Sequence, residues 1–255
     1  MNEQNAQSLW SHDLLWSKAR AYMERALNVP RDDDLFPFWS SLALELLARA
    51  TLAYVHPTLV ADTAEPDGRN LLHALGFDPK VKNFIPRTLG TAVILVRCQQ
   101  IVPDFTKEHE SFCRGFINKR NEELHRGGLP FSQLKNDSWL PRFYESCTAL
   151  LSFQSKDLSD FVGLEEAKAA KIMLEAVADK TAKSVQKLVK EHEKAWKIKR
   201  QKEKDALTIA ARNAAQPSLG HVIDCPACGS KALLHGEQIR QQPPVLENLG
   251  YSRST

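Results

Sequence analysis

The stretch "LFPFWSSLALELLARATLAYV", residues 35–55, decides the fold. It is strongly apolar and rich in residues that favour a helix, so it predicts one long helix. His56 and Pro57 follow it directly and end the helix.

Helical patterns continue on both sides of this stretch. Apolar residues at three- and four-residue spacing, ended by Gly or Pro, predict further helices over 12–28, 69–75, 87–102, 104–126 with Asp104 as cap, and 139–153 with Pro141 in its first turn. No segment alternates for long enough to predict a strand. The expected fold class is therefore all-α, a compact helical bundle followed by a long helical arm and a small cysteine-containing tail.

The character of the sequence changes at Gly163. About 50 residues without Gly or Pro follow, and as one helix they would be about 75 Å long. Pro217 and Gly220 end this run. We therefore expect a helical domain over 1–162, a long basic helix over 163–215 and a tail over 216–255.

Bulk composition indicates a soluble chain of 255 residues, 43% of them hydrophobic. No apolar run approaches the roughly 20 residues that span a bilayer, so no membrane partner is expected. The polar first ten residues do not resemble a signal peptide. Five scattered cysteines do not suggest a disulfide framework, and Cys98, Cys113 and Cys147 are expected to be buried thiols in a reducing, cytoplasmic compartment.

Arg120 stands out on the predicted helix that starts at 104. At about 100° per residue it falls inside an apolar arc of roughly 140°. That arc is formed by Phe105, Phe112, Cys113, Phe116, Ile117 and Leu124. A guanidinium there needs a partner or a cavity, because burying it unpaired costs several kcal/mol. A purely structural role is also open, in which Arg120 points outward, or pairs with Glu123 or with a carboxylate of another helix.

His125 lies in the last turn of the same predicted helix, about 140° around the axis from Arg120. One straight helix would not point both groups at one spot unless its end unwinds or a second copy supplies the other face. Arg120, Asn121 and His125 follow the order R-N-x-x-x-H, which resembles the signature of the HEPN superfamily. The helix that carries Glu45 is also similar to the helix before the motif in many such domains, and the resemblance covers about residues 12–160.

The resemblance implies RNA cleavage without a metal by a homodimer whose facing helices join two Arg/His pairs. RNA carries its own nucleophile, the 2′-hydroxyl, and the products would have 2′,3′-cyclic phosphate and 5′-hydroxyl ends. His125 would be the general acid/base, Arg120 the phosphate clamp, and Asn121 would orient the phosphate or the imidazole. Glu45 is a further catalytic candidate, although it can simply pair with Arg49, four residues on.

Basic residues are concentrated in one segment. Residues 180–204 hold ten Lys or Arg and three Glu, whereas the whole chain has a net charge of only +3. Five lysines recur at helical spacing and form one stripe: Lys183, Lys187, Lys190, Lys194 and Lys197. The stripe is either a solvated helix face or a track for RNA phosphates, with salt-sensitive affinity.

The tail contains "CPAC" at 225–228, which has the form of half a zinc ribbon. A closed structural site needs four ligands, and the remaining candidates in one chain are His221 and His235. Two chains could instead pool their cysteines into one site. The same motif is also compatible with a ribbon cut short, or with an ordinary tight turn that binds no zinc.

These features predict a dimeric endoribonuclease of toxin or antiviral-defence type, with RNA as partner and a regulatory protein as a candidate partner. No cofactor is needed for catalysis, and structural zinc is the one metal considered. The main rival is a non-catalytic helical module that binds a nucleotide or a partner. A coiled-coil scaffold built on the long helix is less favoured because Thr181, Ser184 and Glu191 fall on its a/d register.

Overall fold

The computed structural model describes residues 10–234 of the chain. Helices dominate this part, which confirms the all-α class. The chain divides into two compact units, with the boundary between Val177 and Ala178, inside a long helix. None of the described helices is long and apolar enough to cross a membrane.

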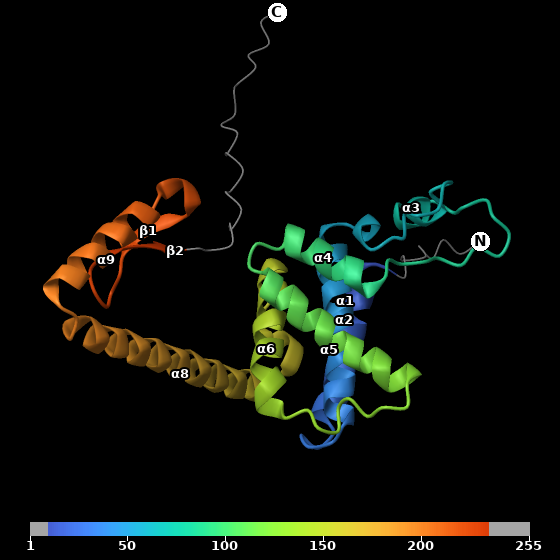
Figure 1. Ribbon diagram of the computed structural model, residues 1–255. Coiled ribbons are helices and arrows are strands. Elements are labelled where there is room, and N and C mark those ends of the chain that lie inside the picture. Colours follow the sequence, from blue (N-terminus) through green and yellow to red (C-terminus); the bar gives the residue numbers. More distant parts are fainter. Residues whose placement is uncertain (1–9, 235–255) are drawn as a thin grey trace, which may run out of the picture. The chain divides into compact units, whose positions relative to one another are not determined.

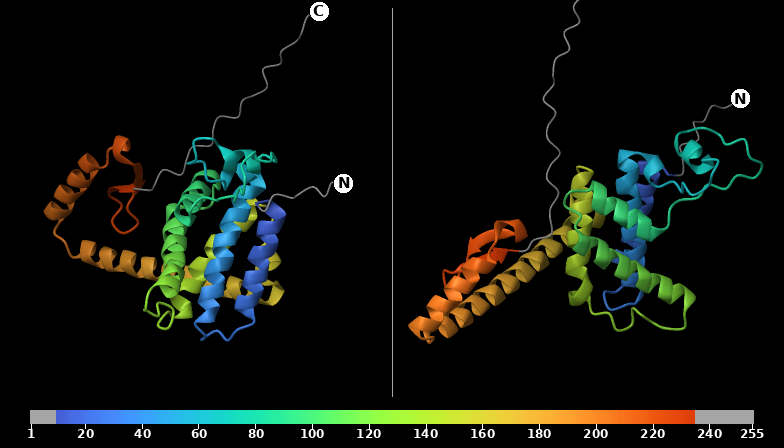
Figure 2. Two further views of the ribbon diagram at one scale, coloured as in Figure 1. Left: turned by 90° about the vertical axis from the view of Figure 1, so that its right-hand side faces the viewer. Right: turned by 45° about the horizontal axis from the view of Figure 1, so that its top comes forward.

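The first unit is built on a pair of long helices that lie side by side, α1 (His12–Leu27) and α2 (Leu35–Val55) (Figures 1 and 2). Ser11 caps α1, its side chain accepting a hydrogen bond from the backbone of Leu14. Twelve residues of α2 are buried, on more than one side of the helix. The strongly apolar stretch that predicts the fold is therefore the central helix of the bundle.

Three further helices surround α2: α4 (Thr91–Ile101), α5 (Lys107–His125) and α6 (Asn136–Phe153) (Figure 1). Their buried side chains, among them Leu95, Phe116 and Phe143, join those of α2 in one core. Burial of this kind is the main favourable term in folding.

The segment between α2 and α4 leaves the bundle and returns to it (Figure 2). It contains the short helices η1 (Pro57–Leu59) and α3 (Arg69–Ala74). Its two ends are tied together, because the backbone N–H of Asp62 donates to the carbonyl of Arg87 (3.0 Å) and that of Leu89 donates to Val60 (3.0 Å). This closure fixes the residues just before α4 against the bundle.

The helix boundaries agree with the predictions to within a few residues, with three differences. The helix α5 is capped by Thr106 and not by Asp104, because the Thr106 side chain and His109 form a reciprocal capping box. The helix α6 begins at Asn136, so Pro141 lies inside it rather than in its first turn. A short helix, α7 (Leu158–Val162), was not predicted.

The long helix α8 (Leu164–Lys197) begins in the first unit and continues into the second. Its first turns are held by Glu166, which accepts hydrogen bonds from Tyr144 and Arg31, and by the buried Ala170. The boundary near residue 177 thus differs from the predicted one at 162, because these turns pack on the bundle core.

The predicted single helix over 163–215 is wrong in one respect. The helix ends at Lys197, and α9 (Gln201–Ala214) starts after an extended Arg200. The break needs no Gly or Pro, since the Lys204 ammonium lies 3.2 Å from the carbonyl of Lys197 and satisfies it.

The second unit also contains a small hairpin that was not predicted. The strands β1 (His221–Asp224) and β2 (Lys231–Leu234) pair antiparallel, after the short helix η2 (Pro217–Leu219). Each strand has only four residues, too few for alternation to be recognised. The hairpin lies beside α9 (Figure 1). Cys225 and Cys228 lie in the turn between its two strands.

Candidate functional site

The carboxylate of Glu45 is the centre of a polar cluster inside the bundle. It accepts hydrogen bonds from Arg120 on α5, from Arg49 one turn along α2 (2.9 Å) and from Thr91 at the start of α4 (2.6 Å). The side chains of Glu45 and Arg120 are each only 14% exposed. The cluster therefore connects three helices through one carboxylate.

The guanidinium of Arg49 is held by the end of the segment that joins α2 to α4. Arg49 donates to the hydroxyl of Thr88 and to the carbonyl of Leu89, both at 3.0 Å. Backbone hydrogen bonds between the two ends of this segment fix the positions of Thr88 and Leu89. The same hydrogen bonds therefore help to position Arg49. Arg49 is thus largely satisfied by the protein itself.

The electrostatics of the cluster favour an ionised Glu45. Burial raises its pKa, but the hydrogen bond from Thr91 and the charges of Arg49 and Arg120 outweigh burial, so the pKa lies below its usual range. Two guanidinium groups thus share one carboxylate, which leaves this trio with a net charge of +1.

Not every polar atom near the cluster is satisfied. The Nε of Arg120 and the Oε2 of Glu123 are buried and have no hydrogen-bond partner within the described chain. Buried polar atoms without a partner are rare in proteins and point to a missing partner or a functional role. The Nε–H of Arg120 is therefore a buried donor without a partner in the described chain.

The other two residues of the R-N-x-x-x-H pattern lie elsewhere on α5. Asn121 and His125 are both exposed, and within residues 10–234 neither forms a hydrogen bond or ion pair with the cluster. His125 is the last residue of the helix. Leu124, predicted to be in the core, is 53% exposed, because the last turn of α5 extends past its packing partners.

The structure therefore unites two of the four predicted catalytic residues. Glu45 and Arg120 form an ion pair, which agrees with the structural role considered for Arg120, and Glu45 also pairs with Arg49, as its spacing on the helix allows. Thr91 was missed, since nothing in the sequence shows that the start of α4 meets residue 45.

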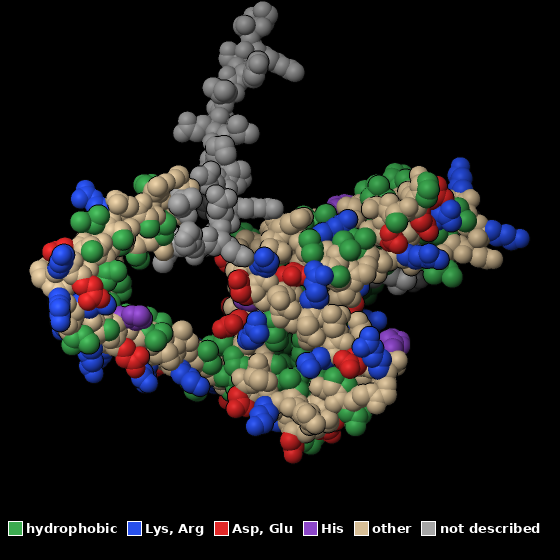
Figure 3. Space-filling model, in the orientation of Figure 1, with side chains coloured by type: hydrophobic (Ala, Val, Ile, Leu, Met, Phe, Trp, Pro, Cys, Tyr) green, Lys and Arg blue, Asp and Glu red, His purple; other side chains and the backbone are tan. Residues whose placement is uncertain are grey.

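The lysine stripe lies on a solvated helix. All five lysines are exposed, and the one ion pair found for them in the described chain is a long one, from Lys187 to Glu191 (3.9 Å). Blue side chains recur along α8 in the space-filling view (Figure 3). Their ammonium groups are accessible, so a phosphate backbone can reach them.

The Cys225–Cys228 turn is closed by a backbone hydrogen bond. The N–H of Gly229 donates to the carbonyl of Cys225 (2.8 Å), and Gly229 has a φ of +70°, which favours glycine. A hydrogen bond with Ser230 lowers the pKa of the Cys228 thiol. The two thiols are thus available in a half-exposed turn.

A complete zinc site is not assembled by the described residues. Among residues 10–234 no three His, Cys, Asp or Glu side chains cluster closely enough to hold a metal, so His221 does not join the two cysteines. His235 lies outside the described residues. Two thiolates do not make a closed site, and zinc binding stays a prediction that needs further ligands.

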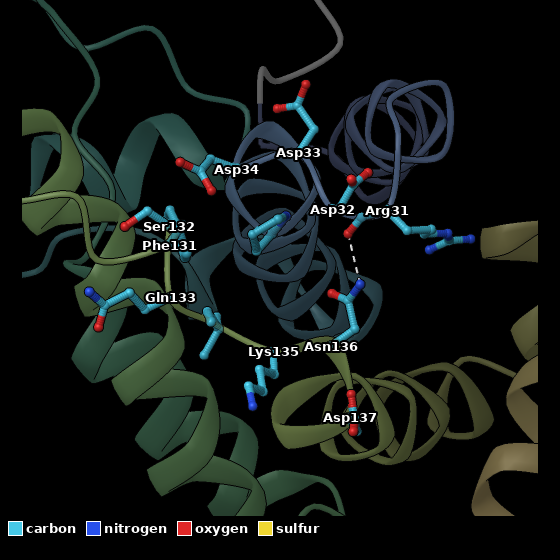
Figure 4. Close-up of a pocket in the computed structure, with 12 residues that line it drawn as sticks. Arg31, Asp32, Asp33, Asp34, Phe131, Ser132, Gln133, Lys135, Asn136 and Asp137 are labelled. Carbon is cyan, nitrogen blue, oxygen red and sulfur yellow. Dashed lines mark hydrogen bonds between the residues drawn. The ribbon is translucent and has the colours of Figure 1, made fainter.

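A cleft of about 540 Å³ lies between the start of α2 and the loop before α6 (Figure 4). Arg31, Pro37 and three successive aspartates, Asp32 to Asp34, face the segment 131–137 across it. The amide of Asn136 donates to the carbonyl of Arg31 (2.7 Å) at one end. None of the predicted site residues lines this cleft, and no sequence pattern pointed to it.

Comparison of the chain with family models, with curated protein sequences and with solved structures found no match.

Proposed function

We propose that this protein is a metal-independent endoribonuclease in which Arg120 binds the scissile phosphate. One observation carries the proposal: Arg120 shares its carboxylate partner with Arg49 and keeps a buried Nε without a partner in the described chain. A guanidinium with spare donors in a partly desolvated site is suited to a phosphate oxygen and to the charge that grows on it during cleavage.

In this proposal Glu45 is not a proton carrier. Its lowered pKa keeps it ionised at neutral pH, so its role is to orient the Arg120 guanidinium. The exposed His125 is the group that moves protons, since an imidazole can both accept and donate a proton. Asn121, next to Arg120, would contact the phosphate or the imidazole.

The proposed enzyme is a homodimer. His125 lies about 140° around α5 from Arg120, so a second copy is needed to bring an imidazole to each guanidinium. The lysine stripe of α8 would hold the RNA backbone without regard to sequence. A toxin or antiviral-defence role, and control by a regulatory protein, rest on the HEPN resemblance alone.

Cleavage in EDTA tests the proposal. We expect the purified protein to cut single-stranded RNA, to leave DNA of the same sequence intact, and to leave 2′,3′-cyclic phosphate and 5′-hydroxyl ends. Arg120→Ala should cut far more slowly. Intact RNA at high protein concentration, or an Arg120→Ala variant as active as the parent, would contradict it.

The second candidate is a non-catalytic helical module, and the Glu45–Arg120 ion pair favours it. The pair already gives Arg120 a carboxylate partner within one chain and ties α2 to α5, which is a structural role in itself. In that case the same assay would show RNA or nucleotide bound but unchanged.

A further inference from the structure

The long helix α8 is amphipathic beyond residue 177. At about 100° per residue its apolar side chains from Ala178 to Trp196 fall within an arc of roughly 140°, and the five lysines of the stripe fall within a narrower arc on the opposite side. In the first unit this apolar face carries Ala167, Ala170 and Leu174, which pack on the bundle core.

Beyond residue 177 most of the same face is exposed, while Val189 and Trp196 at its edge are half-buried. Val185 is 53% exposed and Leu188 is 56% exposed. Ala178, His192 and Ala195 lie on the same face and are exposed as well. Green hydrophobic and blue basic side chains both reach the surface of α8 (Figure 3). Exposed apolar side chains that continue a packed face indicate a contact surface.

The position of the lysines limits what can cover this face. An RNA held by the stripe lies on the opposite side of the helix and leaves Val185 and Leu188 in water. The partner that covers this face must therefore be apolar, and it needs no acidic groups, because the lysines of α8 point away from it. A second α8 meets both conditions, because two such helices in apolar contact direct both lysine stripes outward, without like charges at the interface.

The sequence of the face is also complementary to itself. About a point between Gln186 and Lys187, an antiparallel mate places Val185 opposite Leu188, Thr181 opposite His192, and Ala178 opposite Ala195. In this arrangement the apolar residues Val185, Leu188, Ala178 and Ala195 face apolar residues of the mate, and the polar Thr181 faces the polar His192. The steps along 181, 185, 188, 192 and 195 average about 3.5 residues, which keeps these side chains on one side of the helix.

We infer that α8 is a dimerisation helix that pairs antiparallel with α8 of a second copy through the face that contains Val185 and Leu188. The inference does not rest on RNA cleavage, and it holds for the non-catalytic module too. It concerns α8, whereas the pairing required for the proposed active site concerns α5.

The mass of the full chain in solution tests the pairing. At about 100 µM the parent should be a dimer or larger, and Leu188→Glu should halve its mass, since a carboxylate would be buried at the centre of the α8 interface while any pairing through α5 is left unchanged. Gln186→Glu adds the same charge off the face and should leave the dimer intact. Circular dichroism should show equal helix content in all three.

Disulfide trapping tests the direction of the helices, with Cys225 and Cys228 replaced by serine. Thr181→Cys chains mixed with His192→Cys chains should form a covalent heterodimer, whereas neither variant alone should, because like positions would lie about 16 Å apart along the axis. Cross-linking of each variant with itself would show parallel pairing and overturn the antiparallel arrangement. A monomeric parent, or a dimer that Leu188→Glu does not weaken, would overturn the inference.

Discussion

The helices α2 and α8 have the same kind of backbone but differ in what surrounds them. In α2, 21 residues long, twelve residues are buried, whereas in α8, 34 residues long, only Ala170 is. The first is held by side chains of other helices. The second is formed from residues with high helix propensity and is exposed beyond its first turns.

This difference shows where each kind of function can reside. The packed environment of α2 can hold a carboxylate and two guanidinium groups in fixed positions, as binding or catalysis of a small group requires. The exposed surface of α8 can only offer extended faces, one basic and one apolar. Contacts with large partners are the role that suits it.

The largest expected effect compares one leucine from each helix. Leu44→Ala should lower the free energy of unfolding by about 2–5 kcal/mol, because Leu44 is fully buried in the core. Leu188→Ala should change it by no more than about 0.5 kcal/mol in dilute protein, since that side chain is exposed. Urea unfolding measures both, and equal losses would contradict the comparison.

The next effect concerns the charge at the centre of the α2 cluster. Glu45→Gln should lower the free energy of unfolding at pH 7 by about 1–3 kcal/mol, since two arginines lose their charged partner.

The pH dependence of that loss has a definite sign. The folded pKa of Glu45 is lowered, so its stabilisation is complete above the ordinary carboxyl pKa of about 4.3 and is lost as pH falls through the folded value. The gap between the parent and Glu45→Gln should therefore be constant from pH 7 to about pH 5 and shrink below about pH 4. A gap that widens in acid would show that Glu45 is not ionised in the fold.

The cysteines of the two units should differ in reactivity. Burial raises the pKa of Cys98 and Cys147 well above its usual range, and that of Cys113 to about 12. Iodoacetamide at pH 7 should therefore label Cys225 and Cys228 in the native protein and the other three only after unfolding, as read by peptide mass spectrometry. Zinc added first should protect the two if they bind it, and full labelling despite zinc would remove the zinc prediction.

The smallest expected effect is on RNA affinity. Lys187→Gln with Lys194→Gln should weaken binding a few-fold at low salt and make the affinity less sensitive to salt, because two phosphate contacts are lost. The control is Lys168→Gln, a lysine of α8 that lies before the stripe and pairs with Glu165. If the RNA affinities of the parent, the double variant and Lys168→Gln were equally salt-sensitive, the lysine stripe would not be the RNA-binding surface.

Much of the fold could be predicted from the sequence because apolar periodicity and Gly or Pro breaks specify each helix of the bundle. The burial of Phe116 and Cys113, and of the three expected thiols, follows from the same spacing. The break after Lys197 could not be predicted, since no helix-breaking residue marks it, and the ammonium of Lys204 satisfies the carbonyl of Lys197 there.

The site was only partly predictable for a similar reason. The position of Arg120 on an apolar arc indicated that it needs a partner, and Glu45 was among the candidates. Thr91 and the anchoring of Arg49 by Thr88 and Leu89 depend on how the excursion before α4 closes, which no local pattern reveals. The roles of Asn121 and His125 remain predictions from the resemblance.

RNA cleavage by His125→Ala tests the central claim most directly, because His125 is exposed and its removal should leave the fold unchanged. In EDTA at pH 7 we predict that this variant cuts RNA at least about 100-fold more slowly than the parent, at the same melting temperature. His56→Ala, which removes another exposed imidazole of the first unit, should cut at the parental rate. Cleavage by His125→Ala as fast as by the parent would contradict the proposed role of this imidazole, and intact RNA with both proteins would contradict the nuclease.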